Sequence, residues 1–186
     1  MNLELKARII EANLDVVDIN GFKYNLHLME LGTLKKFKVL LPIFDDVMVG
    51  DCFVSTNWIV TRYGTEEPID LCVRVDSYEF VHDANFSPSK YLISEMTGLF
   101  LNSEKCFLRT IGPDAKPFYA ATLRVRDCFG DQFSNILIAF GNQAKKLSTV
   151  KKNSVIKCEV TVKARKYEEG YEFAVNNFEI ISEGKQ

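Results

Sequence analysis

The residues best suited to chemistry in this chain are cations and aromatic rings on alternate positions of expected strands in its C-terminal half. Successive side chains of a strand point to opposite faces. In residues 154–167 the even positions are mainly apolar, while the odd positions form a largely basic row. That row and its flanking residue supply Lys157, Lys163, Arg165, Lys166 and Tyr167. Cations and flat rings along one surface are what sequence-tolerant binding of an unpaired nucleic acid strand requires.

A second expected strand offers the same mixture of side chains. Within 118–127, one face carries Phe118, Arg124 and Arg126, and the alternate residues are apolar. Phe140 ends a further expected strand directly before Gly141, so its ring belongs either to the surface or to the core. Charged outer faces are also normal on antiparallel strands that bind nothing. The pattern alone therefore leaves a binding surface and a plain solvated surface both open.

The charge of the chain divides between its two halves. Residues 1–82 contain 8 Lys and Arg against 13 Asp and Glu, whereas residues 103–186 contain 14 against 10. Such asymmetry indicates two units with different partners. We expect the basic half to attract phosphate and the acidic half to be repelled by it. The acidic half is therefore expected to contact a protein or a second copy of the chain.

Patterns typical of catalysis or of cofactor and metal binding are missing from the sequence. We find no Gly-rich phosphate loop, no H-x-E or paired-histidine motif and no clustered zinc ligands. The five cysteines are scattered without a C-x-x-C pair and are expected to be free thiols in strands. We therefore expect no enzyme, no cofactor and no metal. Without a long apolar run we also expect no membrane segment, no signal peptide and a cytoplasmic location.

The elements that must position these residues are predominantly strands. Alternation of period two and turn residues, Asn20-Gly21 among them, indicate strands in both halves. The expected strands are 3–9, 16–31 (a hairpin), 36–44, 51–63, 69–81, 106–111, 118–127, 132–140, 154–167 and 171–181. The lysine-rich segment 141–152 is expected to hold a short helix that plugs a barrel. Five strands with a helix before the fourth are typical of the OB-fold.

We therefore predict an all-β chain of two tandem OB-fold barrels, with a short helix in the second and a linker between them. The expected domains are an N-terminal OB-like domain at 1–82 and a C-terminal OB domain at 103–186. The linker, 83–102, begins with polar residues, and its apolar residues have near-helical spacing, so part of it is expected to be helical.

Three motifs in the C-terminal domain resemble the bacterial single-stranded DNA-binding protein family. They are LRTIGPD at 108–114, IAFGNQA at 138–144 and VKARKY at 162–167, and their order and spacing within 105–181 match that family. The resemblance implies an OB-fold that binds single-stranded DNA without catalysis, in replication, recombination or mobile-element DNA processing. It also implies base-stacking rings at Phe140 and Tyr167. The chain departs from the family at Phe133-Ser134, where an exposed Trp is common.

The expected partner is single-stranded DNA, and RNA stays open because stacking accepts any base. The family commonly assembles four OB-folds, a number that two barrels per chain would reach in a homodimer. The corresponding face of the N-terminal domain, the odd residues from Phe53 to Tyr63, keeps a ring but has no cation. Arg62 and Tyr63 are a secondary candidate set. The alternative function is an OB-fold protein-interaction adaptor within a larger nucleoprotein complex.

Overall fold

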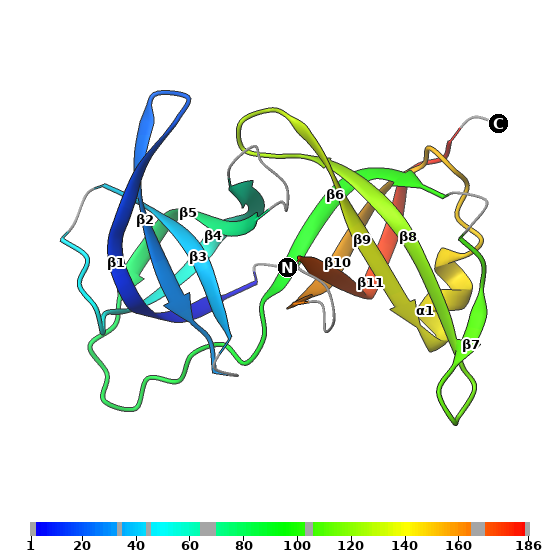
Figure 1. The fold of residues 1–186 in the computed structure, drawn as a ribbon, viewed down its shortest axis with the longest axis horizontal. Coiled ribbons are helices and arrows are strands. Elements are labelled where there is room, and N and C mark those ends of the chain that lie inside the picture. The colour runs from blue at the N-terminus through cyan, green and yellow to red at the C-terminus, as the bar shows by residue number, and fades with distance from the viewer. Residues whose placement is uncertain are drawn as a thin grey trace. The chain divides into compact units, whose positions relative to one another are not determined.

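The computed structural model describes residues 3–32, 35–43, 46–63, 70–102, 106–164 and 170–184. The chain splits into two compact units, Met1–Leu92 and Ile93–Gln186, each made of strands around a core of its own (Figure 1). The predicted all-β class, with two tandem barrels and one short helix in the second, is confirmed. Among the described residues no helix is long and apolar enough to cross a membrane.

The first unit is a closed barrel with the strand order β1-β2-β3-β5-β4. Its strands are β1 (Leu5–Ile19), β2 (Phe22–Glu30), β3 (Lys36–Pro42), β4 (Cys52–Tyr63) and β5 (Asp70–Phe80). Asn20 and Gly21 join β1 to β2 with φ angles of 54° and 86°. Two positive φ angles are what a tight two-residue hairpin loop needs, and Asn-Gly adopts them readily. The hairpin predicted at Asn20-Gly21 is confirmed.

The second unit has one more strand and a helix. Its elements are β6 (Ile93–Leu101), β7 (Arg109–Ile111), β8 (Lys116–Arg126), β9 (Gln132–Phe140), α1 (Gly141–Leu147), β10 (Val155–Ala164) and β11 (Tyr171–Ser182). The sheet order is β6-β10-β11-β9-β8-β7, and a further pairing of β6 with β8 closes the ring of strands. The helix buries Ala144 and Leu147 against β8 and β9, as expected for a barrel plug.

Residues 93–101 form a strand, so the helix expected in this part of the linker is wrong. Met96 and Phe100 are both buried inside the second barrel. Their spacing of four residues fits one face of a helix, but it is also even and therefore fits one face of a strand. Residues 93–101 adopt the strand because they pair with β10 and with β8. The barrel thus begins at β6, and β7 continues the same edge of β8 after residues 102–108.

Strand alternation holds along β10 and β8. On β10, Ile156, Cys158, Val160 and Val162 are buried, and the residues between them are partly exposed. On β8 the buried side chains are Tyr119, Ala121, Leu123 and Val125, opposite the face that carries the predicted cations. Each fully buried large apolar side chain stabilises the folded state by about 1.5–3 kcal/mol. The core therefore fixes which side chains of these two strands reach the surface.

Alternation fails along β4, where the predicted outer face from Phe53 to Tyr63 does not exist as one surface. Phe53, Ser55 and Thr61 are buried, while Asn57 and Ile59 are exposed. The pairing with β5 shifts register on either side of Asn57. An extra residue at a bulge moves the following side chains to the opposite face. The bulges therefore interrupt the expected row.

Candidate nucleic-acid interface

Two phenylalanine rings lie side by side on the outer surface of the second barrel. Phe118 of β8 is directly opposite Phe140 of β9, and their ring centroids are 5.4 Å apart with a 59° angle between the planes. Phe140 is 42% exposed. It is the last residue of β9 and the extended N-cap of α1, and the chain turns away at Gly141, whose φ is 56°. The ring of Phe140 thus belongs to the surface and not to the core.

Two cations face these rings. The guanidinium carbon of Arg109 is 4.9 Å from the Phe118 centroid, and Nζ of Lys163 is 6.0 Å from the Phe140 centroid. Both distances are within the range of cation–π attraction. Among the residues that the structure describes, no carboxylate oxygen lies within 4 Å of either cation. We call Arg109, Phe118, Phe140 and Lys163 the ring–cation cluster.

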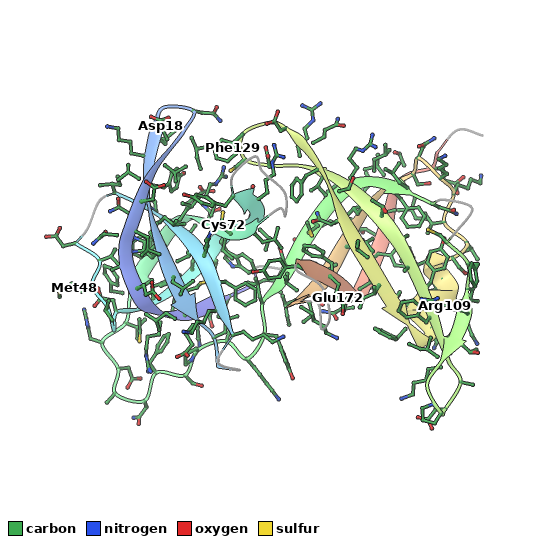
Figure 2. The ribbon with its side chains drawn as sticks, viewed as in Figure 1. Asp18, Met48, Cys72, Arg109, Phe129 and Glu172 are labelled. Carbon is green, nitrogen blue, oxygen red and sulfur yellow. The ribbon has the colours of Figure 1, made fainter. Side chains whose placement is uncertain are left out.

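Each member of the ring–cation cluster is positioned by a different strand. Arg109 stands on β7 directly opposite Phe118, at the end of the barrel where α1 lies (Figure 2). Lys163 comes from β10, where alternation directs it outward. The cluster thus combines exposed ring surface, on which a flat base can stack, with charges that can neutralise a neighbouring phosphate.

Arg124 and Arg126 extend the same surface but do not join the cluster. Both are exposed on the face of β8 that carries Phe118, six and eight residues further along. At about 3.4 Å per residue, Arg124 is about 20 Å from Phe118. They approach the β8–β9 loop, where Phe129 marks the end of the barrel opposite Arg109 (Figure 2). These two arginines suit contacts with a strand that runs along β8.

Lys157 is engaged in an ion pair. Its Nζ is 3.3 Å from Oε2 of Glu95 on the neighbouring strand β6, and both side chains are partly exposed. It lies six residues along β10 from Lys163. A partly solvated pair of this kind adds little to stability. It does reduce the charge that Lys157 presents to a phosphate.

The remaining predicted site residues lie elsewhere. Arg165, Lys166 and Tyr167 fall outside the described residues. Arg62 and Tyr63 end β4 in the first unit. There the Tyr63 hydroxyl donates to Oδ2 of Asp15 at 2.9 Å, and Lys38 Nζ is 4.8 Å from the Tyr63 ring. Tyr63 is therefore held by contacts within its own barrel.

Arg109 is the cluster residue that sequence reasoning missed. The sequence signal for it was the turn at Gly112-Pro113. In the structure the backbone N–H of Ala115 donates to the Gly112 carbonyl and closes this turn. A hairpin centred on that turn places Arg109 opposite Phe118. Counting cross-strand partners outward from the turn would have identified Arg109 as the cation beside the predicted ring.

Two ionisable groups of the second barrel, on β10 and β8, have pKa values shifted by burial. The buried Cys158 is a thiol, and burial raises its pKa to about 12. Burial also raises the pKa of Tyr119, whose hydroxyl has no hydrogen-bond partner within the described part of the chain. The described residues contain no group of three or more His, Cys, Asp or Glu that could hold a metal ion. Burial thus keeps the Cys158 thiol and the Tyr119 hydroxyl protonated at neutral pH.

Comparison with known proteins gives a match in fold alone. No protein-family model and no curated protein sequence matches the chain. The crystal structure of the single-stranded DNA-binding protein from Thermus aquaticus matches with a TM-score of 0.63 at 11% identity, over 100% of this chain and 95% of that chain. A deletion mutant of the Thermus aquaticus protein gives 0.62 at 11% identity, over 100% and 97%. The chain therefore has the tandem OB-fold architecture of bacterial single-stranded DNA-binding proteins of this kind.

Proposed function

We propose that the second barrel binds single-stranded DNA, without catalysis, at the ring–cation cluster. The observation that carries the proposal is the pair of neighbouring rings, the half-buried Phe118 and the exposed Phe140, each with a cation over it. Stacking on a ring is sequence-tolerant because every base has a flat face, and each stacked base contributes about 1–3 kcal/mol. Two rings and two cations form a compact binding point for one or two nucleotides.

The surroundings of the cluster support a longer path. Arg124 and Arg126 would contact phosphates further along β8, and Lys157 would contribute less because Glu95 partly neutralises it. We propose Arg165, Lys166 and Tyr167 as additional contacts. Arg62 and Tyr63 are proposed as secondary contacts from the first barrel. The second unit has 14 Lys and Arg against 11 Asp and Glu. This positive excess is small, so the unit attracts phosphate only where its cations gather on the surface.

We further propose that this binding protects exposed strands during replication, recombination or mobile-element DNA processing in the cytoplasm. The whole-chain likeness to the Thermus aquaticus protein, which is named for single-stranded DNA binding, supports the ligand class. A homodimer of the chain would assemble four barrels. RNA is the competing ligand, because stacking does not distinguish the two nucleic acids.

The test is fluorescence polarisation of the full chain with labelled oligo-dT and oligo-rU at low salt, followed by titration with salt. We expect oligo-dT to bind and the affinity to fall as salt is added. Phe140→Ala should weaken binding about tenfold, because one stacked base is lost. The matched control is Phe129→Ala, which removes a ring of similar exposure (40%) at the other end of β8 and should change affinity much less.

Two results would contradict the proposal. One is the absence of oligo-dT binding by the folded wild-type chain at low salt. The other is equal loss of affinity in Phe129→Ala and Phe140→Ala, which would remove the special role of the cluster. Stronger binding of oligo-rU than of oligo-dT would keep the site and reassign its ligand to RNA.

A further inference from the structure

The positive charge of the second unit is concentrated in one stretch of its sequence. Residues 132–158 contain no Arg, Asp or Glu. They contain five lysines, which are Lys145, Lys146, Lys151, Lys152 and Lys157. Outside this stretch the second unit has 9 Lys and Arg against 11 Asp and Glu. The positive excess of the unit therefore comes from this stretch, which includes α1.

Two of these lysines lie on the outer face of α1. The helix buries Ala144 and Leu147 against the barrel. Residues three and four positions apart share a face of a helix. The face opposite the buried residues continues into the following turn and carries exposed polar side chains at Asn142, Lys145, Lys146 and Thr149. We call Lys145 and Lys146 the lysine pair.

The ammonium groups of the lysine pair are not needed to end the helix. Basic side chains in a last turn often bind the final carbonyl groups. Here Ser148 and Thr149 take that role, because their hydroxyls donate to the carbonyls of Lys145 and Lys146, each at 2.8 Å. Among the residues that the structure describes, no carboxylate oxygen lies within 4 Å of either ammonium group. Both charges are therefore available to an anion.

The lysine pair lies close to the ring–cation cluster. Phe140 is the N-cap of α1, and the helix packs against β8 and β9, the strands that carry the two rings (Figure 1). At 1.5 Å per residue, the lysine pair is about 8–9 Å along the helix from Phe140. Neighbouring phosphates of a stacked strand are about 3.4 Å apart along its axis. A strand stacked on Phe140 would therefore reach the lysine pair within about three nucleotides.

The first barrel has no counterpart of the lysine pair. There Tyr24 of β2 pairs with Pro42 of β3, as Phe118 pairs with Phe140 in the second barrel. In both barrels the third strand also pairs in parallel with the last strand two residues before this point. The described residues that follow Pro42 form no helix, and a pocket of about 750 Å³ lies at this position instead. The extension over a helix thus belongs to the second barrel.

The chemistry of the lysine pair favours phosphate over a protein surface. In the described residues 141–164, no large hydrophobic side chain is exposed. Protein interfaces have an apolar core in which lysine is depleted. Lysine binds phosphate as a point charge and needs no apolar surroundings. An exposed face of lysines without apolar side chains is therefore suited to the backbone of a nucleic acid.

We propose that a DNA single strand held at the ring–cation cluster continues over α1, where Lys145 and Lys146 bind its phosphates. The inference rests on the function proposed above and adds a second part to the site. A short strand occupies the cluster alone, whereas a longer strand also reaches the lysine pair. An acidic segment of a partner protein is the competing occupant.

The test is fluorescence polarisation of the full chain with labelled oligo-dT of about 5 and about 20 nucleotides, lengths that span the site sizes of OB-folds. Lys145→Gln/Lys146→Gln removes both charges and keeps good helix formers. For the long strand, the slope of log affinity against log salt should become shallower by about 1.4, the amount for two phosphate contacts. The short strand should bind as it does to the wild type. Lys145→Arg/Lys146→Arg keeps both charges and should keep the wild-type slope.

The matched control is Lys35→Gln/Lys36→Gln, which removes two neighbouring exposed lysines of the first unit and changes the net charge equally. It should leave the slope for the long strand unchanged. Thermal melting of each variant verifies that both barrels remain folded.

Three results overturn the proposal: an unchanged slope for the long strand in Lys145→Gln/Lys146→Gln, a change equal to that of the control, or equal losses for the short and long strands. Labelled oligo-Glu tests the competing occupant, and binding of it that depends on the lysine pair, with an unchanged slope for the long strand, reassigns the pair to a protein partner. If the wild type binds neither strand, the proposed function fails as well. If the extension alone fails, Phe140→Ala still weakens binding of the short strand.

Discussion

The two barrels place different chemistry at the same register position. In the second unit, Phe118 and Phe140 are partly open to solvent and face cations that no described carboxylate neutralises. In the first unit, Tyr24 and Pro42 take those places, and the Arg74 charge is tied to Asp76. The OB scaffold supplies the position, while a few side chains decide whether it carries two partly exposed rings or a pocket. Fold alone therefore does not assign both barrels the same ligand.

The largest expected effect comes from a substitution that destabilises the second barrel and leaves the first barrel folded. Gly98 lies where β6 crosses β8, and a Cβ there would overlap the Arg124 carbonyl and lie 2.8 Å from Cγ1 of Val125. Gly98→Ala should lower the free energy of unfolding of the second unit by about 1–3 kcal/mol through overpacking. Trp58, the single tryptophan, reports the first unit by fluorescence, and far-ultraviolet circular dichroism reports both.

The control for Gly98→Ala is Thr97→Ala, at an exposed neighbour on the same strand, which should change stability by less than about 0.5 kcal/mol. The affinity for oligo-dT should fall because the second unit is destabilised. The unfolding midpoint reported by Trp58 fluorescence should stay unchanged. A shift of the Trp58 transition as large as the shift by circular dichroism would contradict independent unfolding of the barrels.

Acid should destabilise the first barrel selectively through His27. Both histidines, His27 and His82, belong to the first unit. His27 is fully buried, its Nδ1 accepts the Asn13 N–H at 3.2 Å, and burial lowers its pKa from 6.5. The folded state therefore keeps it neutral, whereas the unfolded chain takes up a proton below pH 6.5. The contribution of neutral His27 to the free energy of unfolding is fully present above pH 6.5. Below pH 6.5 the free energy of unfolding falls by up to about 1.4 kcal/mol per pH unit, until the folded-state pKa of His27 is reached.

The measurement is the pH dependence of urea unfolding between pH 7 and pH 5, followed by Trp58 fluorescence. His27→Gln should flatten this dependence even if it lowers stability overall, and His82→Ala should leave it unchanged. An identical slope in His27→Gln would show that other groups carry the acid sensitivity.

The smallest expected effect is a difference in the salt dependence of oligo-dT binding between variants of two lysines of β10. Lys163 lies over the Phe140 ring, whereas Lys157 is paired with Glu95. Lys163→Ala should lessen the slope of log affinity for oligo-dT against log salt by about 0.7, the amount for one phosphate contact on a single strand. Lys157→Ala should change the slope less. Equal changes in the two variants would place the nucleic acid along the whole strand and not at the cluster.

Most of the strands and hairpins could be predicted from local patterns. Alternation along β8 and β10 and the Asn20-Gly21 turn involve residues that are close in sequence, and their outcome follows from backbone geometry. Alternation therefore predicts outward positions for Phe118 and Lys163. Local patterns also misled: the four-residue spacing of Met96 and Phe100 fits two periods, and the bulges around Asn57 cannot be read from residue types.

The sequence by itself determined the all-β class, the two barrels, the charge difference between the halves and the outward faces of β8 and β10. Only the tertiary structure decided that Lys163 reaches Phe140, that Arg109 joins Phe118, and that the first barrel closes its equivalent position into a pocket. The parallel pairing of β9 with β11, and the pairing of β6 with both β8 and β10, join segments far apart in sequence. Such contacts depend on the packing of the whole barrel, which local residue patterns do not encode.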